Sequence, residues 1–223
     1  KTLPGKNNDI EISIIGKDER KNQHFIPQKR WQENDGKQVN IFEVPEFVSL
    51  ADKLKSFTIL DKLYLITQGT KPFQVGKGKP NQTEEIRDTK PFTSNKQLAK
   101  NWLPFYDGKN INRYQLQWNG NNWLNYGAWL AEPRKPSVFE SEKILIRKIT
   151  GKTLIATYIA ETSYCNTLLF VLKLKEESYS YKSILAVLNS DLIGWYFRNK
   201  FQISDEDTFP QIMIRDILQF PIP

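Results

Sequence analysis

A stripe of large apolar side chains near the end of the chain constrains the fold more than any other feature of this sequence. The stripe repeats at helical spacing between residues 181 and 199, and Ser180 stands where a helix N-cap is expected. Its members are Ile184, Leu185, Leu188, Leu192, Trp195 and Tyr196. Burying such a face contributes on the order of 1.5–3 kcal/mol for each large side chain. The pattern therefore predicts a central core helix over residues 181–199.

Short apolar or β-branched runs, divided by turn residues, predict the strands. The clearest are KILIRKIT, TLIATYI and TLLFVLKL, at residues 143–150, 153–159 and 167–174. Further strands are expected from an alternating pattern at 10–14, an extended pattern at 24–32 and a run at 60–73. Pro27 argues for an edge position in the second of these, and Gly69 stops the third.

Two segments between the strands have sequence patterns that do not predict a strand. Residues 45–57 place Phe47, Leu50 and Leu54 at helical spacing, which predicts a short amphipathic helix. Residues 76–91 are polar and rich in Gly and Pro, which predicts a surface loop. Strands and helices alternate without a regular βαβ order. We therefore expect an α+β fold, with a mixed β-sheet and a few helices that include the buried C-terminal core helix.

Composition narrows the class of protein. A length of 223 residues allows one domain or two small lobes, and 39% hydrophobic with 26% charged residues is a globular balance. No apolar run approaches ~20 residues, so no membrane span is expected. The single Cys165 rules out a disulfide within the chain and favours a reducing, cytoplasmic location. Because the sequence starts at Lys1 without an initiating Met, we expect a piece of a longer protein.

The charge balance favours a polyanionic partner. Lys and Arg number 32 against 25 Asp and Glu, which gives a net charge of +7. Each phosphate that such a protein neutralises releases counterions, so binding should weaken as salt rises. A basic surface that is merely solvated is the alternative.

A catalytic interpretation has few residues to build on. His24 is the only histidine, and a triad or a zinc site needs partners that it lacks. Gly76 and Gly78 have neither the GxGxxG nor the Walker spacing. Asp205, Glu206 and Asp207 are the only close carboxylate cluster, and a metal-dependent nuclease built on them is one alternative.

Basic residues alternate with planar aromatics in the second half of the chain. Lys109, Arg113, Tyr114 and Trp118 form one such group, Tyr126, Trp129, Arg134 and Lys135 form another, and Arg147 and Lys148 follow on a predicted strand. Cationic heads bind phosphates, while Arg, Asn and Gln offer the paired hydrogen-bonding groups that base edges require. The cations are therefore expected to contact DNA, whereas each tryptophan taken singly is better explained as a core residue.

Five segments between residues 103 and 223 follow one another in a familiar order. They are LPFYDGKNINRY, GAWLAEPRKPSVFESEKILIRKITG, LIATY, ILAVLNSDLIGWYF and FPQIMIRDILQFPIP. Upstream, LYLITQGTKPF is similar to the segment that opens this region in related enzymes. This order resembles the TaqI-like C-terminal specificity domain, the target-recognition domain of restriction–modification adenine methyltransferases.

The resemblance implies a chain that recognises DNA and holds no catalytic residue, cofactor or metal of its own. The parent would be an adenine-specific DNA methyltransferase, with or without a fused endonuclease, that uses S-adenosylmethionine. Its methyl-donor loop and NPPY-type motif would lie upstream, since neither occurs in this sequence. The parent would flip the target adenine out of the duplex. The specificity subunit of a type I restriction system is a further alternative.

These expectations assign residues 1–57 to an N-terminal strand-rich segment with a short helix, serving as a connector or extra lobe. Residues 58–223 are assigned to the DNA target-recognition domain. Its expected partners are double-stranded DNA and a covalently linked upstream methyltransferase domain, and a monomer is expected. The expected DNA-binding residues are Lys109, Arg113, Tyr114, Arg134, Lys135, Arg147, Lys148, Gln68 and Lys71.

Overall fold

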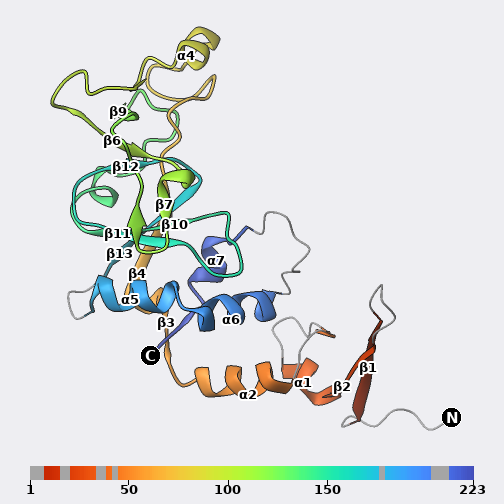
Figure 1. Ribbon diagram of the computed structural model, residues 1–223. Coiled ribbons are helices and arrows are strands. Elements are labelled where there is room, and N and C mark those ends of the chain that lie inside the picture. The colour runs from red at the N-terminus through yellow and green to blue at the C-terminus, as the bar shows by residue number, and fades with distance from the viewer. Residues whose placement is uncertain (1–7, 16–20, 34–38, 42–44, 176–178, 202–210) are drawn as a thin grey trace. The chain divides into compact units, whose positions relative to one another are not determined.

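The computed structural model describes residues 8–15, 21–33, 39–41, 45–175, 179–201 and 211–223 (Figure 1). The chain divides into two compact units. The first comprises Lys1–Phe57 and Tyr196–Ser204, and the second comprises Thr58–Trp195 and Asp205–Pro223. Each unit is described by itself.

The first unit combines a β-hairpin with short helices. Strands β1 (Asp9–Ile15) and β2 (Lys21–Pro27) pair in antiparallel fashion, and helices α1 (Gln28–Glu33) and α2 (Pro45–Leu54) follow. The Arg30 guanidinium donates to Asp52 over 3.1 Å and so connects the two helices. The buried Phe47 ring lies 5.8 Å from the ring of Tyr196. The helix expected at 45–57 is confirmed, and its apolar side is the side that packs.

The second unit is built on a four-stranded antiparallel sheet in the order β11-β10-β13-β4. These strands are β4 (Tyr64–Gln68), β10 (Lys143–Arg147), β11 (Ala156–Ile159) and β13 (Leu169–Leu174). Ile144, Leu145 and Ile146 in β10 and Val171 and Leu172 in β13 have no exposed surface. Burial on both faces explains why these strands read as continuous apolar runs rather than as an alternation. The three strands expected from those runs, and the end of β4 before Gly69, are confirmed. The strand expected from residue 60 is wrong at its start, because residues 60–63 form a short helix and β4 begins at Tyr64.

A second sheet of four strands, in the order β12-β6-β9-β5, lies in the same unit (Figure 1). Its strands are β5 (Thr93–Ser94), β6 (Trp102–Tyr106), β9 (Trp123–Asn125) and β12 (Tyr164–Cys165). Strand β12 runs parallel to β6, whereas the other pairs are antiparallel. The sheet is therefore mixed, and the α+β class is confirmed.

Short elements complete the second unit. Strands β3 (Thr58–Ile59) and β14 (Pro221–Ile222) pair, as do β7 (Ile111–Asn112) and β8 (Gln115–Leu116). The helical pieces are α3 (Leu60–Leu63), α7 (Ile214–Ile217) and the 3-10 turns η2 (Gly108–Asn110) and η3 (Pro136–Val138). Strand β14 lies at the Pro-rich end of the chain.

Aromatic rings fill the core between these elements. Tyr126 and Tyr164 stack with centroids 4.5 Å apart, and the fully buried Phe139 meets Tyr164 edge-on at 5.1 Å. Trp118 contacts Tyr106 and Trp123 edge-on at 5.6 Å and 5.1 Å. The explanation of single tryptophans as packing residues fits this arrangement, because both indole rings lie against core rings.

The continuous core helix expected over 181–199 is wrong, because the structure breaks it into α5 (Tyr181–Leu188) and α6 (Asp191–Phe201). The buried Asn189 side chain exchanges two hydrogen bonds of 2.9 Å with the backbone of Ala156. Ser190 Oγ then accepts from the Ile193 amide and starts a new helix. Leu192 is consequently 44% exposed, while Ile184, Leu185 and Leu188 stay buried.

Two other expectations need correction. The extended pattern over 24–32 holds only as far as Pro27, after which α1 begins at Gln28. The loop expected at 76–91 contains helix α4 (Glu84–Thr89), because the Thr83 hydroxyl accepts from the Ile86 amide as an N-cap. Thr83 followed by acidic residues is a helix-start signal within a polar segment. Among the described residues, each helix is too short or too polar to cross a bilayer.

A lysine begins the central strand β10 and is completely buried. Lys143 Nζ donates to the carbonyl oxygens of Ser141, at 3.1 Å, and Glu161, at 2.6 Å. Burial lowers the pKa of Lys143 from an ordinary value of 10.5 to about 8, because desolvation disfavours the charged form. The buried charge therefore reduces stability at neutral pH.

We predict that the contribution of Lys143 to stability rises with pH. Below about pH 8 both states hold the proton, so the folded state bears the full cost of the buried charge. Between about 8 and 10.5 the unfolded state keeps the proton that the folded state releases. The free energy of unfolding of the wild type, minus that of Lys143→Met, should increase by about 2 kcal/mol from pH 7 to pH 10. Urea unfolding of both proteins measures it, and a difference independent of pH would contradict this assignment.

Candidate nucleic-acid interface

Several elements of the second unit contact the turn formed by residues 166–168, between β12 and β13. The Asn166 side-chain oxygen accepts from the Leu168 amide over 3.0 Å and fixes the turn. The Asn166 amide donates to Tyr106 O over 2.9 Å, and Asn166 bridges Thr70. Leu168 at the tip is 44% exposed. An apolar side chain is thus held at the surface on a rigid backbone.

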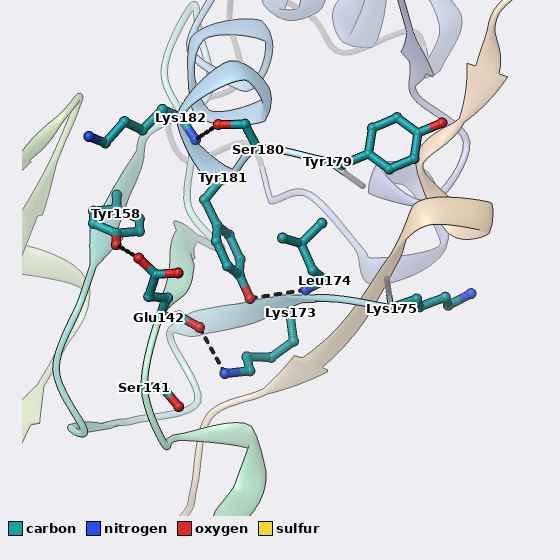
Figure 2. A pocket seen from close by; sticks show the side chains of 10 residues that line it. All are labelled: Ser141, Glu142, Tyr158, Lys173, Leu174, Lys175, Tyr179, Ser180, Tyr181 and Lys182. Carbon is teal, nitrogen blue, oxygen red and sulfur yellow. Dashed lines mark hydrogen bonds between the residues drawn. The ribbon is translucent and has the colours of Figure 1, made fainter. Parts of the chain in front are cut away.

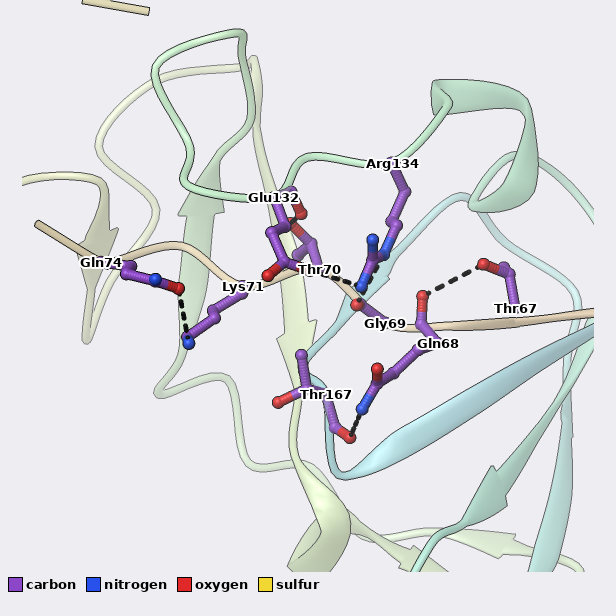
Figure 3. A network of polar contacts seen from close by, with 9 residues as sticks. All are labelled: Thr67, Gln68, Gly69, Thr70, Lys71, Gln74, Glu132, Arg134 and Thr167. Carbon is purple, nitrogen blue, oxygen red and sulfur yellow. Dashed lines mark hydrogen bonds and ion pairs between the residues drawn. The ribbon is translucent and has the colours of Figure 1, made fainter. Parts of the chain in front are cut away.

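Three of the predicted DNA-binding residues border this 166–168 turn. Gln68 Nε2 donates to Thr167 O over 2.8 Å (Figure 3). The Lys148 amide donates to Leu168 O over 2.9 Å, and Arg147 lies opposite Leu169 in the ladder between β10 and β13. The ends of β4, β10 and β13 therefore deliver these side chains to one place.

The 3-10 turn η2, which carries Lys109, lies against the same turn. The Gly108 backbone lies against Leu168, since a Cβ built on Gly108 would be 3.5 Å from Leu168 Cβ. Asp107 and Asn110 form a capping box that fixes η2. The Lys109 side chain is 82% exposed and lies 3.6 Å from the Asp107 carboxylate, a solvated pair of small energy. Its ammonium is therefore available to a partner.

Arg134 contacts Gly69, and the Gly69 backbone in turn lies next to Asn166 of the turn. Its Nε donates to Gly69 O over 3.4 Å, and its Nη2 donates to the Glu132 carboxylate over 2.7 Å (Figure 3). Lys71 pairs through its backbone with Glu132, and its Nζ donates to the Gln74 side chain over 2.8 Å. Arg134 and Lys71 are thus held by protein partners, and both keep part of their surface open to solvent.

The remaining expected residues are tied elsewhere. Arg113 Nη2 donates to Asn189 O over 2.6 Å, at the end of α5. The Tyr114 amide donates to Ala156 O over 2.9 Å, while its ring is 54% exposed. Lys135 is exposed and follows Arg134 in the chain. The structure therefore brings the Gln68 side chain and the backbones that carry Lys109, Arg147 and Lys148 to the 166–168 turn, with Arg134 on the neighbouring Gly69, and places the others outside these contacts.

Sequence reasoning missed the turn itself. Thr167 and Leu168 belonged to a run that was expected to be strand throughout, whereas β13 begins at Leu169. Asn166 was the available signal, because Asn favours turns in which its side chain accepts from the amide two residues on. A group of surface amides at residues 115–121 was also missed.

A cavity of about 670 Å³ lies beside the start of α5 (Figure 2). Tyr158 donates to the Glu142 carboxylate, which raises the pKa of that phenol to about 12. Lys173 Nζ donates to the carbonyl oxygens of Glu140 and Glu142, at 2.7 Å and 2.8 Å. The Tyr181 hydroxyl oxygen accepts from the Leu174 amide over 3.1 Å. The Tyr158 hydroxyl, the Lys173 ammonium and the Tyr181 hydroxyl are thus engaged with neighbouring groups of the protein.

The other chemical candidates do not assemble a site in the part of the chain that the structure describes. Cys165 is buried, and burial raises the pKa of its thiol to about 12, so the thiolate is not available at neutral pH. His24 contacts Ile41 O at 3.1 Å in the first unit. Asp205, Glu206 and Asp207 lie outside the described residues. Within those residues, no cluster of three or more His, Cys, Asp or Glu side chains could hold a metal ion.

The sequence has recognisable relatives. It matches the family described as the TaqI-like C-terminal specificity domain over residues 103–222. A provisionally named type II restriction enzyme and methyltransferase, RM.MjaORFECS2P of Methanocaldococcus jannaschii, is 27% identical over 187 residues. That alignment covers 80% of this chain, and the chain spans only 14% of the length of this relative.

Two solved structures align with part of this chain. The HsdS subunit from Thermoanaerobacter tengcongensis aligns with a TM-score of 0.44 and 14% identity, over 75% of this chain and 32% of its own. A structure of a type I R-M system aligns with a TM-score of 0.43 and 14% identity, over 80% of this chain and 40% of its own.

We predict that Gly69→Ala disrupts the 166–168 turn. A Cβ at Gly69 would lie 2.1 Å from Asn166 O and 2.5 Å from Cys165 O, so the two backbone segments must separate. The free energy of unfolding should fall by about 3 kcal/mol, measured by urea denaturation. Gly151→Ala is the matched control, because nothing lies within 4 Å of a Cβ there, and it should stay within about 0.5 kcal/mol of the wild type. Equal unfolding midpoints for the two variants would show that the close approach at Gly69 is absent.

Proposed function

The chain belongs to the family of TaqI-like C-terminal specificity domains, whose task is DNA target recognition in restriction–modification systems, and from that premise we propose that residues 58–223 form the DNA target-recognition domain of a larger enzyme. Residues 1–57 would be a connector or extra lobe. The division of the chain between Phe57 and Thr58 supports this boundary, while Tyr196–Ser204 group with the first unit.

The observation that carries the proposal is that backbone segments bearing positive side chains meet at the 166–168 turn. Lys109 comes from η2, and Arg147 and Lys148 stand at the end of β10; Gly108 beside Lys109, and the backbones of Arg147 and Lys148, contact Leu168 or Leu169. Arg134 joins them through Gly69. Cations gathered on rigid backbone suit a line of phosphates, which fixes the register of a duplex without reading its sequence. The net charge of +7 favours the same partner.

Arg113, Tyr114, Lys135, Gln68 and Lys71 are proposed as further contacts. Arg113 already donates to Asn189 O, so it would use its remaining N–H groups. Gln68 donates one N–H to Thr167 O and keeps its side-chain oxygen as an acceptor. Their contribution should be smaller than that of the freely solvated Lys109.

For the whole protein we infer an adenine-specific DNA methyltransferase, with or without a fused endonuclease. The name and length of the relative from Methanocaldococcus jannaschii support a larger enzyme of this class. Such an enzyme uses S-adenosylmethionine as its methyl donor. The residues of this chain do not fit that molecule, since the sequence has neither a methyl-donor loop nor an NPPY tetrad. The part played by this chain is to hold the duplex while a covalently linked catalytic domain flips the adenine.

The expected setting is a monomeric protein in the cytoplasm. The buried, unpaired Cys165 supports a reducing compartment, because a thiol that no other cysteine can join needs no oxidising environment.

We predict that duplex binding is salt-dependent and that single lysines account for measurable parts of the slope. Lys109→Ala and Lys148→Ala should weaken binding to all duplexes alike. Each should also reduce the slope of log affinity against log salt by roughly 0.9, because one phosphate contact is lost. Fluorescence anisotropy with a labelled duplex at several salt concentrations measures both effects.

The matched control is Lys182→Ala. Lys182 is exposed in the same unit but lies beyond the far end of β13, about 20 Å along the strand direction from the 166–168 turn. It should leave affinity and slope unchanged. A wild-type protein that retards no duplex at low salt would refute the proposed function, and equal effects of all three substitutions would refute the proposed location.

A further inference from the structure

Side-chain amides project from alternate positions of the segment that follows β7. Gln115, Gln117, Asn119 and Asn121 are all exposed, whereas Leu116 and Trp118 between them are partly buried against the core. We call these four residues the amide row. The four amides therefore lie on the solvent side of the segment, whereas Leu116 and Trp118 pack towards the core.

The backbone beneath the amide row is fixed by neighbouring elements. The Gln117 amide donates to Asn110 O over 2.7 Å, and Asn110 Nδ2 donates back to Gln117 O over 2.9 Å. Trp123 Nε1 donates to Gly120 O over 2.8 Å, and Asn122 Nδ2 donates to Phe105 O over 2.8 Å. The row is therefore presented by a segment that is anchored at both ends.

Three members of the row, Gln117, Asn119 and Asn121, line a cavity of about 600 Å³. The other lining residues are Lys109, Asn110 and Trp118. None of the lining residues carries a negative charge, and Lys109 is one of the proposed phosphate contacts. The cavity therefore combines three amides with one cation.

The side-chain amides of Asn119 and Asn121 have no hydrogen-bond partner among the residues that the structure describes. Gln117 Nε2 has only a long contact of 3.5 Å with Gln115 Oε1. Polar groups in a cavity are normally paired with protein or water. These amides keep their donors and acceptors for an outside partner.

Primary amides suit one nucleobase in particular. Asn and Gln can donate to N7 and accept from the N6 amino group of adenine in the major groove, with two parallel hydrogen bonds. Lysine and arginine, by contrast, pair with guanine. Trp118, held edge-on between Tyr106 and Trp123, gives the cavity a rigid floor.

We propose that Gln117, Asn119 and Asn121 read adenine bases of the recognised DNA sequence, while Lys109 holds the adjoining phosphate. This assignment rests on the proposed function and deepens it. It names the side chains that confer sequence preference and the class of base they prefer. The 166–168 turn and its cations would then supply affinity, and the amide row would supply specificity.

The test begins with the wild-type protein and a library of duplexes with a randomised centre. Sequences that the protein retains define its preferred duplex. Each adenine of that duplex is then replaced in turn by 7-deazaadenine, which lacks only the N7 acceptor. Binding is compared for the wild type, Gln117→Ala, Asn119→Ala and Asn121→Ala.

The expected result is coupling between one amide and one adenine. The 7-deazaadenine substitution should weaken wild-type binding about tenfold at the position that an amide contacts. The same substitution should have less than about a twofold effect on the alanine variant of that amide. Asn119→Asp should shift the preferred base at its position from adenine towards cytosine, because a carboxylate accepts from the cytosine amino group. A purely structural side chain would not produce that change.

Asn81→Ala, in an exposed part of the loop before α4, is the matched amide control and should keep the full tenfold effect. Coupling in any one of the three alanine variants supports the proposal. If none shows coupling, or if each weakens the preferred duplex and unrelated duplexes equally, the assignment is overturned while the proposed function stands. If the wild type retains no duplex from the library, the proposed function fails and this assignment fails with it.

Discussion

The close approach of two backbone segments at Gly69 is the contact on which the second unit depends. The Gly69 amide donates to Leu169 O over 2.9 Å, and the Thr70 amide donates to Cys165 O over 2.8 Å. The first bond belongs to the end of the β4–β13 ladder, and the second joins the chain after β4 to the end of β12. One pair of residues therefore connects the two four-stranded sheets. Any side chain at Gly69 would collide with this junction.

The junction also determines where the positive charges lie. The 166–168 turn exists because β12 must end and β13 must begin within a few residues, in two different sheets. The ends of β4 and β10 and the 3-10 turn η2 meet at the same turn, and each brings a polar or cationic side chain. The buried contacts that stabilise the fold lie within the sheets, while the proposed interface consists of residues at the ends of their strands. This division allows surface residues to vary without altering the core.

The sequence predicted the repetitive parts of this fold well. Strands β10, β11 and β13 are buried on both faces, so their apolar runs could not be mistaken for surface. The helix at 181–199 was predicted as continuous, because the spacing of apolar residues contains no information about the hydrogen bond between Asn189 and Ala156, 33 residues away. The cations were identified from composition, but their convergence depends on the pairing of strands distant in sequence. Gln117, Asn119 and Asn121 were overlooked, since an exposed amide looks the same in a loop as in a binding site.

The most direct test of the account is hydrogen–deuterium exchange of the protein with and without a duplex that it retains. The central claim is that the duplex lies against the 166–168 turn and the neighbouring segment 108–121. Backbone amides in those two segments should exchange more slowly in the complex, whereas those around the cavity beside α5 should be unchanged. Protection confined to the α5 cavity, with none at 108–121 or 166–168, would contradict the account.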